Sequence, residues 1–280
     1  MKRMLLAALA MGTTLCALAQ TDSTATRTDT TITDNGRGPD TVRIGGLVIV
    51  RNGRADRNIS WNSHNHNRRT PKNLSSNWFI FDLGFANWND QTNYASPEAA
   101  AFVPGGTKEG LKLRTGKSVN VNIWIYMQKL NLAKHRLNLK YGIGLELNNY
   151  HFDDERVHFY EDPTVVRFDY DRVSKNKLAA DYVTVPVMLN FDFTPSRRKG
   201  FGFSAGVSAG YLYSSRQKVK IAGKKDKTHD NFDLEPWKLS WIGELNLGPV
   251  RLYGSYAMNN MWSRGLDQKP YTVGLRFSHW

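Results

Sequence analysis

Residues 182–193 read YVTVPVMLNFDF, and apolar and polar side chains alternate along this stretch. In an extended chain every second side chain points to the same side, so the alternation predicts a strand with one apolar and one polar face. The same period recurs through the last two-thirds of the sequence. A chain with this pattern is constrained to an all-β structure. Pro186 interrupts the regularity, because proline has no N–H to donate to a neighbouring strand.

Eight segments share this period of two. They are residues 78–88, 118–130, 137–152, 182–193, 201–213, 237–247, 250–258 and 271–280. The connections between them alternate between short ones (131–136, 194–200, 248–249) and long ones (89–117, 153–176, 214–236, 259–270). An even strand number with short turns at one end and long loops at the other is typical of outer-membrane barrels. We therefore expect an eight-stranded antiparallel up-and-down transmembrane β-barrel over residues 77–280, with both ends of the barrel domain in the periplasm.

A soluble β-sandwich is the alternative fold, since its strands alternate too. Three features favour the barrel: apolar faces as long as tilted membrane strands of about ten residues, aromatic residues at segment ends, and a chain that stops on a strand. The aromatic residues expected at the two membrane interfaces are Phe79, Phe191, Phe193, Phe201, Phe277 and Trp280 on one side, and Trp88, Tyr211, Tyr213, Trp237, Tyr256 and Tyr271 on the other. The mean hydropathy of -0.51 does not oppose a barrel, because strands with one polar side average to nearly neutral.

Residues 1–20 have the pattern of a signal peptide. Lys2 and Arg3 precede an apolar run that ends in Ala-Leu-Ala-Gln20, the pattern of a cleaved secretory signal. The single cysteine, Cys16, lies inside this segment, so we expect neither a lipid anchor nor a disulfide in the mature chain. Export together with an outer-membrane barrel implies a Gram-negative cell.

Residues 21–76 are polar and have little to bury, so we expect a mostly disordered periplasmic segment. Within it, residues 41–52 contain two short apolar runs that are compatible with a short hairpin. His64 and His66 have the spacing of metal ligands, but no cysteine or carboxylate lies close by, which favours a solvated linker. We expect no metal and no cofactor.

The polar faces of the predicted strands carry four acids and four bases. These inward charges are Asp82, Lys140, Glu146, Asp192, Lys238, Glu244, Arg251 and Arg276. Eight strands leave an interior just wide enough for side chains, and buried charges must be paired there. The sequence thus predicts an interior closed by paired charges, with a narrow pore as the alternative. Because a closed barrel has no edge strand, we expect a bulge or a broken ladder at Pro186, with its ring toward the lumen.

The formal net charge is +13, of which Lys2 and Arg3 supply two. At a bacterial surface the available anion is lipid phosphate, so we expect outer-membrane lipid as a partner and no nucleic acid. The connection 214–236 is the most basic, and its cations are Arg216, Lys218, Lys220, Lys224, Lys225 and Lys227. This basic loop is either a solvated loop or a contact to lipopolysaccharide phosphates.

A lipid-modifying enzyme with a serine and a histidine is a third class of function. His151 and His158 are near Ser214 and Ser215 if the predicted strands are correct, but no spacing motif joins them. The adjacent Ser278 and His279 point to opposite faces of a strand and cannot act together. We therefore expect no catalytic residues.

The stretch YVTVPVMLNF at residues 182–191 resembles the strand with a mid-strand proline of PorT-like outer-membrane β-barrel proteins, and the glycine-rich GFGFSAGVSAGYLY follows it as in that family. The last segment, YTVGLRFSHW, resembles the C-terminal signal that barrel-insertion machinery reads. The resemblance covers residues 78–280 and implies a barrel fold and an outer-membrane location. We expect a structural or interaction module with a protein partner that the sequence does not identify; a narrow small-solute channel is the alternative and a lipid-modifying enzyme comes third.

Overall fold

The computed structural model describes residues 40–44, 47–51, 72–161, 163–169, 171, 173–195 and 200–278. It has two compact units, Met1–Ser63 and His64–Trp280. In the first unit, β1 (Asp40–Ile44) pairs antiparallel with β2 (Leu47–Arg51), and this pair overlaps residues 41–52, where the sequence indicated a hairpin. The predicted signal peptide and most of the predicted disordered segment, including His64 and His66, lie outside the described residues.

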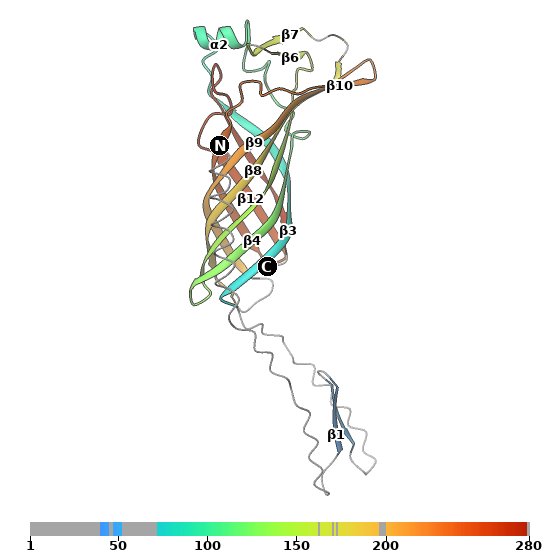
Figure 1. Cartoon of the computed structure of the whole chain (residues 1–280), viewed down its shortest axis with the longest axis vertical. Helices are drawn as coiled ribbons and strands as arrows, with labels where there is room; N and C mark the ends of the chain where they lie inside the picture. Colours follow the sequence, from blue (N-terminus) through green and yellow to red (C-terminus); the bar gives the residue numbers. More distant parts are fainter. Residues whose placement is uncertain are drawn as a thin grey trace, which may run out of the picture. The chain divides into compact units, whose positions relative to one another are not determined.

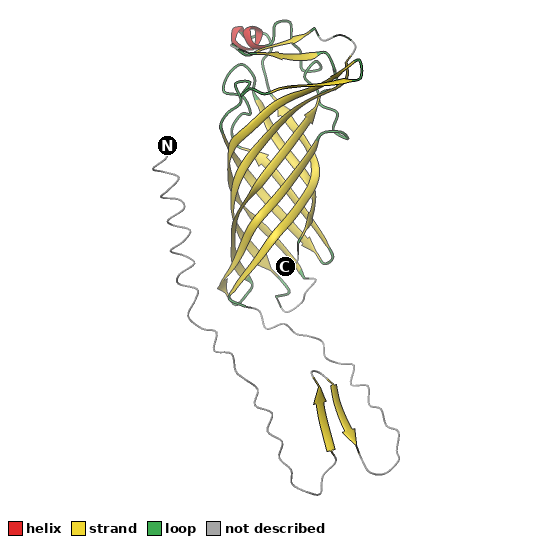
Figure 2. Ribbon diagram, turned by 45° about the vertical axis from the view of Figure 1, so that its right-hand side comes forward, coloured by secondary structure: helices red, strands yellow, loops and turns green. Residues whose placement is uncertain are grey.

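The second unit contains an eight-stranded antiparallel barrel, which confirms the predicted fold class (Figure 1, Figure 2). Its strands are β3 (Leu74–Asp90), β4 (Val119–Ala133), β5 (Leu137–His151), β8 (Val173–Asp192), β9 (Phe201–Ile221), β11 (Trp237–Leu247), β12 (Val250–Ala257) and β13 (Gln268–Phe277). Each strand pairs with its neighbour in the chain, and β13 pairs with β3, which closes the ring. We call the end with the long connections the loop end and the other the turn end.

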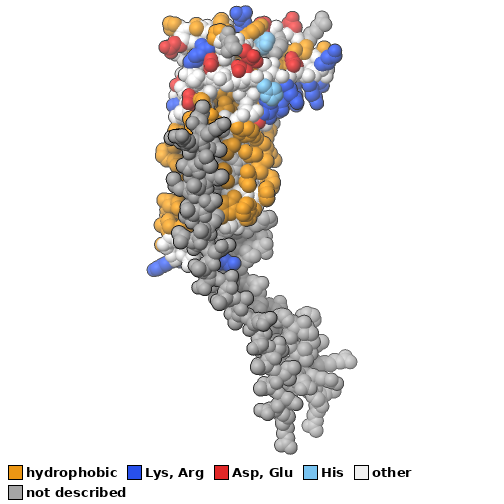
Figure 3. Space-filling model, in the orientation of Figure 1, with side chains coloured by type: hydrophobic (Ala, Val, Ile, Leu, Met, Phe, Trp, Pro, Cys, Tyr) orange, Lys and Arg blue, Asp and Glu red, His pale blue; other side chains and the backbone are white. Residues whose placement is uncertain are grey.

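Side chains on the wall alternate as the sequence predicts. Trp241 and Leu245 on β11 are 61% and 49% exposed, whereas Glu244 is 4% exposed. Figure 3 shows hydrophobic side chains covering the wall between the two ends. A water-soluble protein rarely exposes so continuous an apolar surface, and a lipid-embedded barrel requires one.

The alternation changes phase near the turn end. Phe79 in β3 has a φ of 53°, and Ile125, opposite it in β4, lies at a register shift between β4 and β5. Beyond this irregularity Met127 lies on the inner face and is 1% exposed, whereas unbroken alternation over residues 118–130 would have placed it outside with Val121 and Ile123. Tyr126 lies against the exposed Trp78 instead, with ring centroids 4.5 Å apart. An extra residue in a strand exchanges the two faces for all that follows, which period-two reasoning cannot detect.

The sequence predicted a bulge or a broken ladder at Pro186; β8 passes this residue without a register shift, so there is no bulge, but one of its two ladders is broken there. Pro186 is paired with Ser208 of β9, and its side chain is buried on the inner face. On the other side, the ladder to β5 is interrupted between Val187 and Thr184. The interruption spans Pro186, which has no N–H to donate to the ladder.

The long connections contain further elements. These are α2 (Pro97–Phe102), β6 (Val157–Tyr160), β7 (Val165–Phe168) and β10 (Lys224–Thr228). The side chain of Ser96 accepts a hydrogen bond from the backbone N–H of Ala99 and so caps α2. β6 and β7 pair as a hairpin, and β10 pairs with the end of β9. Among the described residues, no helix is long and apolar enough to cross a membrane, a finding that does not bear on β-barrels.

Candidate functional site in the barrel interior and the loop cap

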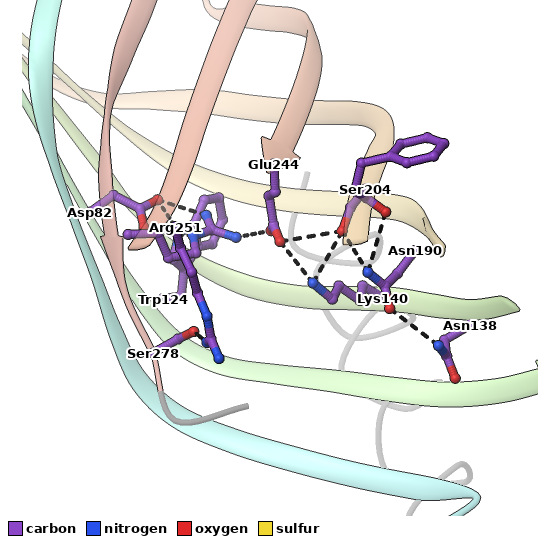
Figure 4. A network of polar contacts seen from close by, with 11 residues as sticks. Asp82, Trp124, Asn138, Lys140, Asn190, Ser204, Glu244, Arg251 and Ser278 are labelled. Atoms are coloured by element: carbon purple, nitrogen blue, oxygen red, sulfur yellow. Dashed lines mark hydrogen bonds and ion pairs between the residues drawn. The ribbon is translucent and has the colours of Figure 1, made fainter. Parts of the chain in front are cut away.

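Four charged side chains from four strands meet inside the barrel (Figure 4). Arg276 on β13 binds Asp82 on β3 with two contacts, Nε–Oδ1 at 2.7 Å and Nη2–Oδ2 at 2.6 Å. Its remaining terminal nitrogen pairs with Glu244 on β11. The ammonium of Lys140 on β5 lies 2.7 Å from the second oxygen of Glu244. All four are buried, so each charge depends on its partners for the solvation that water would give.

Neutral donors and acceptors extend this group across the lumen. Trp124 Nε1 donates to Asp82 at 2.7 Å. On the other side, Lys140 donates to Ser204 at 3.1 Å, and Asn190 donates to the same hydroxyl at 3.0 Å. Asn138 in turn donates to Asn190 at 3.1 Å. Figure 4 shows these side chains pointing toward one another from strands on opposite sides.

A second ion pair joins Lys238 on β11 to Glu146 on β5. Asn148 donates to Glu146 at 3.1 Å and accepts from Asn120 at 2.9 Å, and Tyr253 donates to Asn120 at 2.5 Å. Asn120 also donates to Asn122 at 3.0 Å, which donates to Asp82 at 3.1 Å. These contacts join both ion-pair groups into one network, to which all eight barrel strands contribute at least one side chain.

Six of the eight predicted interior charges therefore come together in this network. The other two, Asp192 and Arg251, are only partly buried near the turn end. Asp192 accepts a hydrogen bond from the backbone of Thr194 at 3.0 Å, and Arg251 donates to Ser278. The sequence analysis did not single out the neutral members of the network, although inward asparagines at alternating positions of β4 were a visible signal.

The long connections fold into a cap with its own hydrophobic core, which we call the loop cap. Phe159 of β6 stacks on Trp262 of the last connection at 5.6 Å between centroids, and lies 5.5 Å from Phe232 of the third. Phe102 of α2, in the first connection, packs edge-on against Trp262 at 5.5 Å. Trp88 is 7% exposed and belongs to this core, so its predicted place in an interface girdle is wrong. All four long connections thus share one core.

A polar cluster fixes the first connection to the last. Asp90 accepts from Tyr94 at 2.7 Å and from Gln268 at 2.9 Å, and Gln268 accepts from Trp262 at 2.9 Å. Burial, together with the hydrogen bond to Asp90, raises the pKa of Tyr94 well above its ordinary value. Tyr94 therefore stays a neutral donor at any physiological pH.

The residues of the predicted basic loop are not in a loop. All six lie on the end of β9 or on β10, which together with the start of β8 form an extension of the wall. Arg216 pairs with Asp181 of β8 at 2.5 Å, and this contact neutralises its charge. Lys218, Lys220, Lys225 and Lys227 are on one face of the extension, whereas Lys224 falls on the other by strand alternation.

Three of the four residues considered for lipid chemistry have their side chains in contacts with other groups, and His151 makes a backbone contact. His158 contacts Asp169 at 3.2 Å, and the backbone N–H of His151 donates to Ser118. Ser215 donates to the carbonyl of Asp230, and Ser214 accepts from Arg216. Within the described part of the chain, no group of three or more His, Cys, Asp or Glu side chains is placed to hold a metal ion.

A family model matches the barrel, and two solved structures are similar to the chain. Residues 83–261 match the family model described as outer membrane protein beta-barrel domain, which covers more than half of the chain. Two similar solved structures are Neisserial surface protein A and Ail, the attachment invasion locus protein of Yersinia pestis. Both are 11% identical; they cover 74% and 72% of this chain and 99% and 98% of their own, with TM-scores of 0.31 and 0.30. Among curated proteins, none matches the sequence. From the family match over the barrel, the chain belongs to the outer membrane protein beta-barrel domain family and is an outer-membrane protein.

Proposed function

We propose that this protein is a closed outer-membrane barrel that serves as a structural or interaction module and does not conduct solutes. The observation that carries this proposal is the buried network from Lys238 to Asn138, which crosses the lumen and draws on every barrel strand. Its ionised members balance, with Asp82, Glu146 and Glu244 against Lys140, Lys238 and Arg276. Because these charges are paired and balance, the network offers no net charge that would draw ions into the lumen.

Conductance across a planar bilayer tests the closed interior. We expect the refolded full chain to give no reproducible single-channel steps, under conditions where a general porin does. The variant Phe159→Ala, which weakens the loop cap but leaves the network intact, is expected to be equally silent. Steady steps from the unaltered protein would support the narrow channel instead, and steps from Phe159→Ala alone would show that the cap is the barrier.

We infer that the loop end faces the cell exterior and that the turn end faces the periplasm. The support is the length of the connections, since outer-membrane barrels have short periplasmic turns and longer external loops. Because Cys16 is the only cysteine in the sequence and lies in the predicted signal peptide, single-cysteine labelling is clean. A membrane-impermeant maleimide should label Glu98→Cys on intact cells, and Lys134→Cys only after permeabilisation. The reverse pattern would invert the proposed orientation.

The interaction role is supported by the loop cap. Four long connections that share one aromatic core hold a fixed surface, and loops on a rigid scaffold commonly carry recognition. Photo-crosslinking residues placed at the exposed positions Glu98 and Arg167 should give a discrete adduct in intact cells. The same residue at the lipid-facing Leu245 is the control for non-specific capture. Equal adducts at all three positions would remove the support for a partner at the cap.

Two finer assignments follow from the sequence resemblance. We infer that the chain is a PorT-like member of its family, because β8 carries Pro186 on its inner face and the next strand, β9, has a glycine-rich inner face. We also infer that β13 is the strand that barrel-insertion machinery reads. The protein is not proposed to be an enzyme; acyl chains of the outer-membrane lipids should be unchanged after its expression, and a change would contradict this.

A further inference from the structure

The ends of β8, β9 and β10 form a three-stranded sheet at the loop end (Figure 1), and lysines face one another across it. Lys218 of β9 pairs with Lys177 of β8 on one side and Lys227 of β10 on the other. Two residues further on, Lys220 pairs in the same way with Lys175 and Lys225. Directly paired residues, and residues two apart on one strand, point to the same side. The resulting lysine face consists of Lys175, Lys177, Lys218, Lys220, Lys225 and Lys227.

The two acids nearest to the lysine face are either on the opposite face or already paired with an arginine. None of the salt bridges between described residues involves any of the six lysines. Asp226 falls between two of these lysines on β10, so alternation places it on the opposite face. Asp181, on β8, is bound to Arg216 at 2.5 Å. Like charges directly opposite each other destabilise a sheet, so an external anion on this face would offset the repulsion among the six lysines.

The opposite face of the same sheet is anchored in the loop cap. Gln217 is 1% exposed; it donates to the carbonyl of Val157 at 2.9 Å and accepts from the backbone N–H of Phe159 at 3.2 Å. Val219 is 5% exposed. The lysines are exposed or half-buried. The lysines therefore project from a sheet whose backbone is held in place. This lowers the conformational-entropy cost of binding a ligand.

The lysine face continues the lipid-facing surface of the wall. Tyr211 and Tyr213 are exposed on that surface, at 46% and 49%. A register shift between β8 and β9 skips Tyr213, so beyond it the even-numbered residues of β9 point outward and the odd-numbered ones are buried. Lys218 and Lys220 are thus on the outer side, a few residues past the aromatic side chains that mark a membrane interface. In Figure 3, Lys and Arg side chains gather at the loop end next to the hydrophobic band.

We propose that the lysine face binds a lipid headgroup that carries more than one phosphate, in the leaflet around the loop end. Strands are about 4.8 Å apart and every second residue along a strand about 7 Å apart, so the six ammonium groups form a compact grid. Such a grid places two or three cations around each of two phosphates. A headgroup with a single phosphate would contact only about half of these ammonium groups. The position beside the membrane interface favours a lipid over a soluble polyanion. This inference rests on the proposed interaction role and names one partner for it.

Lipid titration followed by native mass spectrometry tests the proposal on the refolded full chain in detergent. Diphosphoryl lipid A is the probe, and monophosphoryl lipid A and free pyrophosphate are the comparisons. We expect the variant K218Q/K220Q, which removes the central lysine of each row, to weaken binding of the diphosphoryl lipid by about tenfold or more, or about 1.4 kcal/mol. The matched control K108Q/K224Q removes two exposed loop-end charges that are off the face and should bind as the unaltered protein does.

Three results would overturn the proposal: no binding of the diphosphoryl lipid by the unaltered chain, equal weakening in K108Q/K224Q, or pyrophosphate binding to the lysines as tightly as the lipid. Heat-modifiable gel migration of each variant shows whether it is folded, and the central lysines are solvent-facing, so both variants should fold. The lipid titration is independent of the conductance and orientation measurements. If the protein does not conduct and also does not bind the lipid, only the lipid-binding inference is wrong. A conducting barrel that binds the lipid would remove only the proposed closed interior.

Discussion

Arg276 is the residue on which most of the interior depends. Its guanidinium joins two buried carboxylates, Asp82 and Glu244, that would otherwise face each other without a cation between them. Arginine suits this place because its planar fork binds one carboxylate with two contacts and still has a nitrogen for the other. Lysine, with one ammonium group, would satisfy only one of them well.

Arg276→Met should therefore lower the free energy of unfolding by about 3–5 kcal/mol, because it leaves the buried carboxylate of Asp82 without a cation, while Glu244 keeps only Lys140. Urea unfolding of the refolded protein in lipid, followed by gel migration, measures this loss. The double variant Arg276→Met, Asp82→Asn should recover most of it, since Asp82 is then neutral and Glu244 keeps its ion pair with Lys140. A loss of under about 0.5 kcal/mol, as for an exposed position such as Arg167→Gln, would show that the pairing is not as described.

Two glycines, one on the inner and one on the outer face of the wall, differ in the space around them. A Cβ at Gly206, on the inner face, would lie against the carbonyl oxygen of Val187 and 2.6 Å from the Cα of Met188. At Gly243, on the outer face, the nearest atom is the carbonyl oxygen of Ser204 at 3.8 Å. The first glycine is needed for the close approach of β8 and β9, and the second is not.

Gly206→Ala is expected to destabilise the barrel by about 1–3 kcal/mol, because the backbone of β8 must move to admit the methyl group. Gly243→Ala is the matched control and should stay within about 0.5 kcal/mol of the unaltered protein. Both are measured by the fraction that refolds into the heat-modifiable form across a urea series. Equal effects would contradict the close approach at Gly206.

At the scale of elements, the β6–β7 hairpin is held by a titratable contact. Asp169 accepts from Tyr160 at 2.5 Å and contacts His158 at 3.2 Å, and Arg167 lies over the ring of Tyr160. Partial burial acts to raise the pKa of Asp169, but the hydrogen bonds from Tyr160 and His158 outweigh it, and the pKa lies below its ordinary value. The contact thus stabilises the hairpin only while the carboxylate is ionised.

Because the folded-state pKa of Asp169 is depressed, its contribution is present above the ordinary aspartate value of about 3.9 and is lost as the pH falls below it. Hydrogen-exchange protection factors of the β6 and β7 amides should fall on acidification through this range. Asp169→Asn should remove that dependence, whereas the exposed Asp171→Asn should keep it. If the protection factors of Asp169→Asn still fall in the same way, another group controls the hairpin.

At the scale of the whole molecule, the chain has two kinds of core. The wall has its apolar surface on the outside, where lipid covers it, and a polar network inside. The loop cap reverses this order and buries its aromatic residues around Phe159, as a water-soluble domain does. The two parts meet where strands such as β8 and β9 extend beyond the aromatic side chains. Because each part has its own core, we expect the loop cap to unfold without the wall.

Phe159→Ala should open the loop cap and leave the wall folded. Phe159 is 2% exposed and contacts aromatic rings from three segments, so its loss should cost about 3–5 kcal/mol of cap stability. Limited proteolysis should then cut the long connections while the barrel keeps its heat-modifiable migration. Phe85→Ala, on the lipid-facing side, is the control and should leave the cap resistant. Loss of the folded barrel in Phe159→Ala would show that the two parts are one cooperative unit.

The number of barrel strands, most of their inward and outward positions and six of the charges that meet inside could be predicted from the sequence, because these depend on alternation along a single strand. Residues such as Glu244 and Arg276 are inward whatever their neighbours are. Features that depend on the register between strands, or on contacts between connections, could be read only from the folded structure. Met127 changed face at an irregularity near Ile125, Trp88 joined a cap core made by four distant segments, and Lys175 and Lys177 came to face the lysines of β9. A period of two carries no information about which residue of another strand lies opposite, and that pairing, set by bulges and packing, is what builds the lysine face.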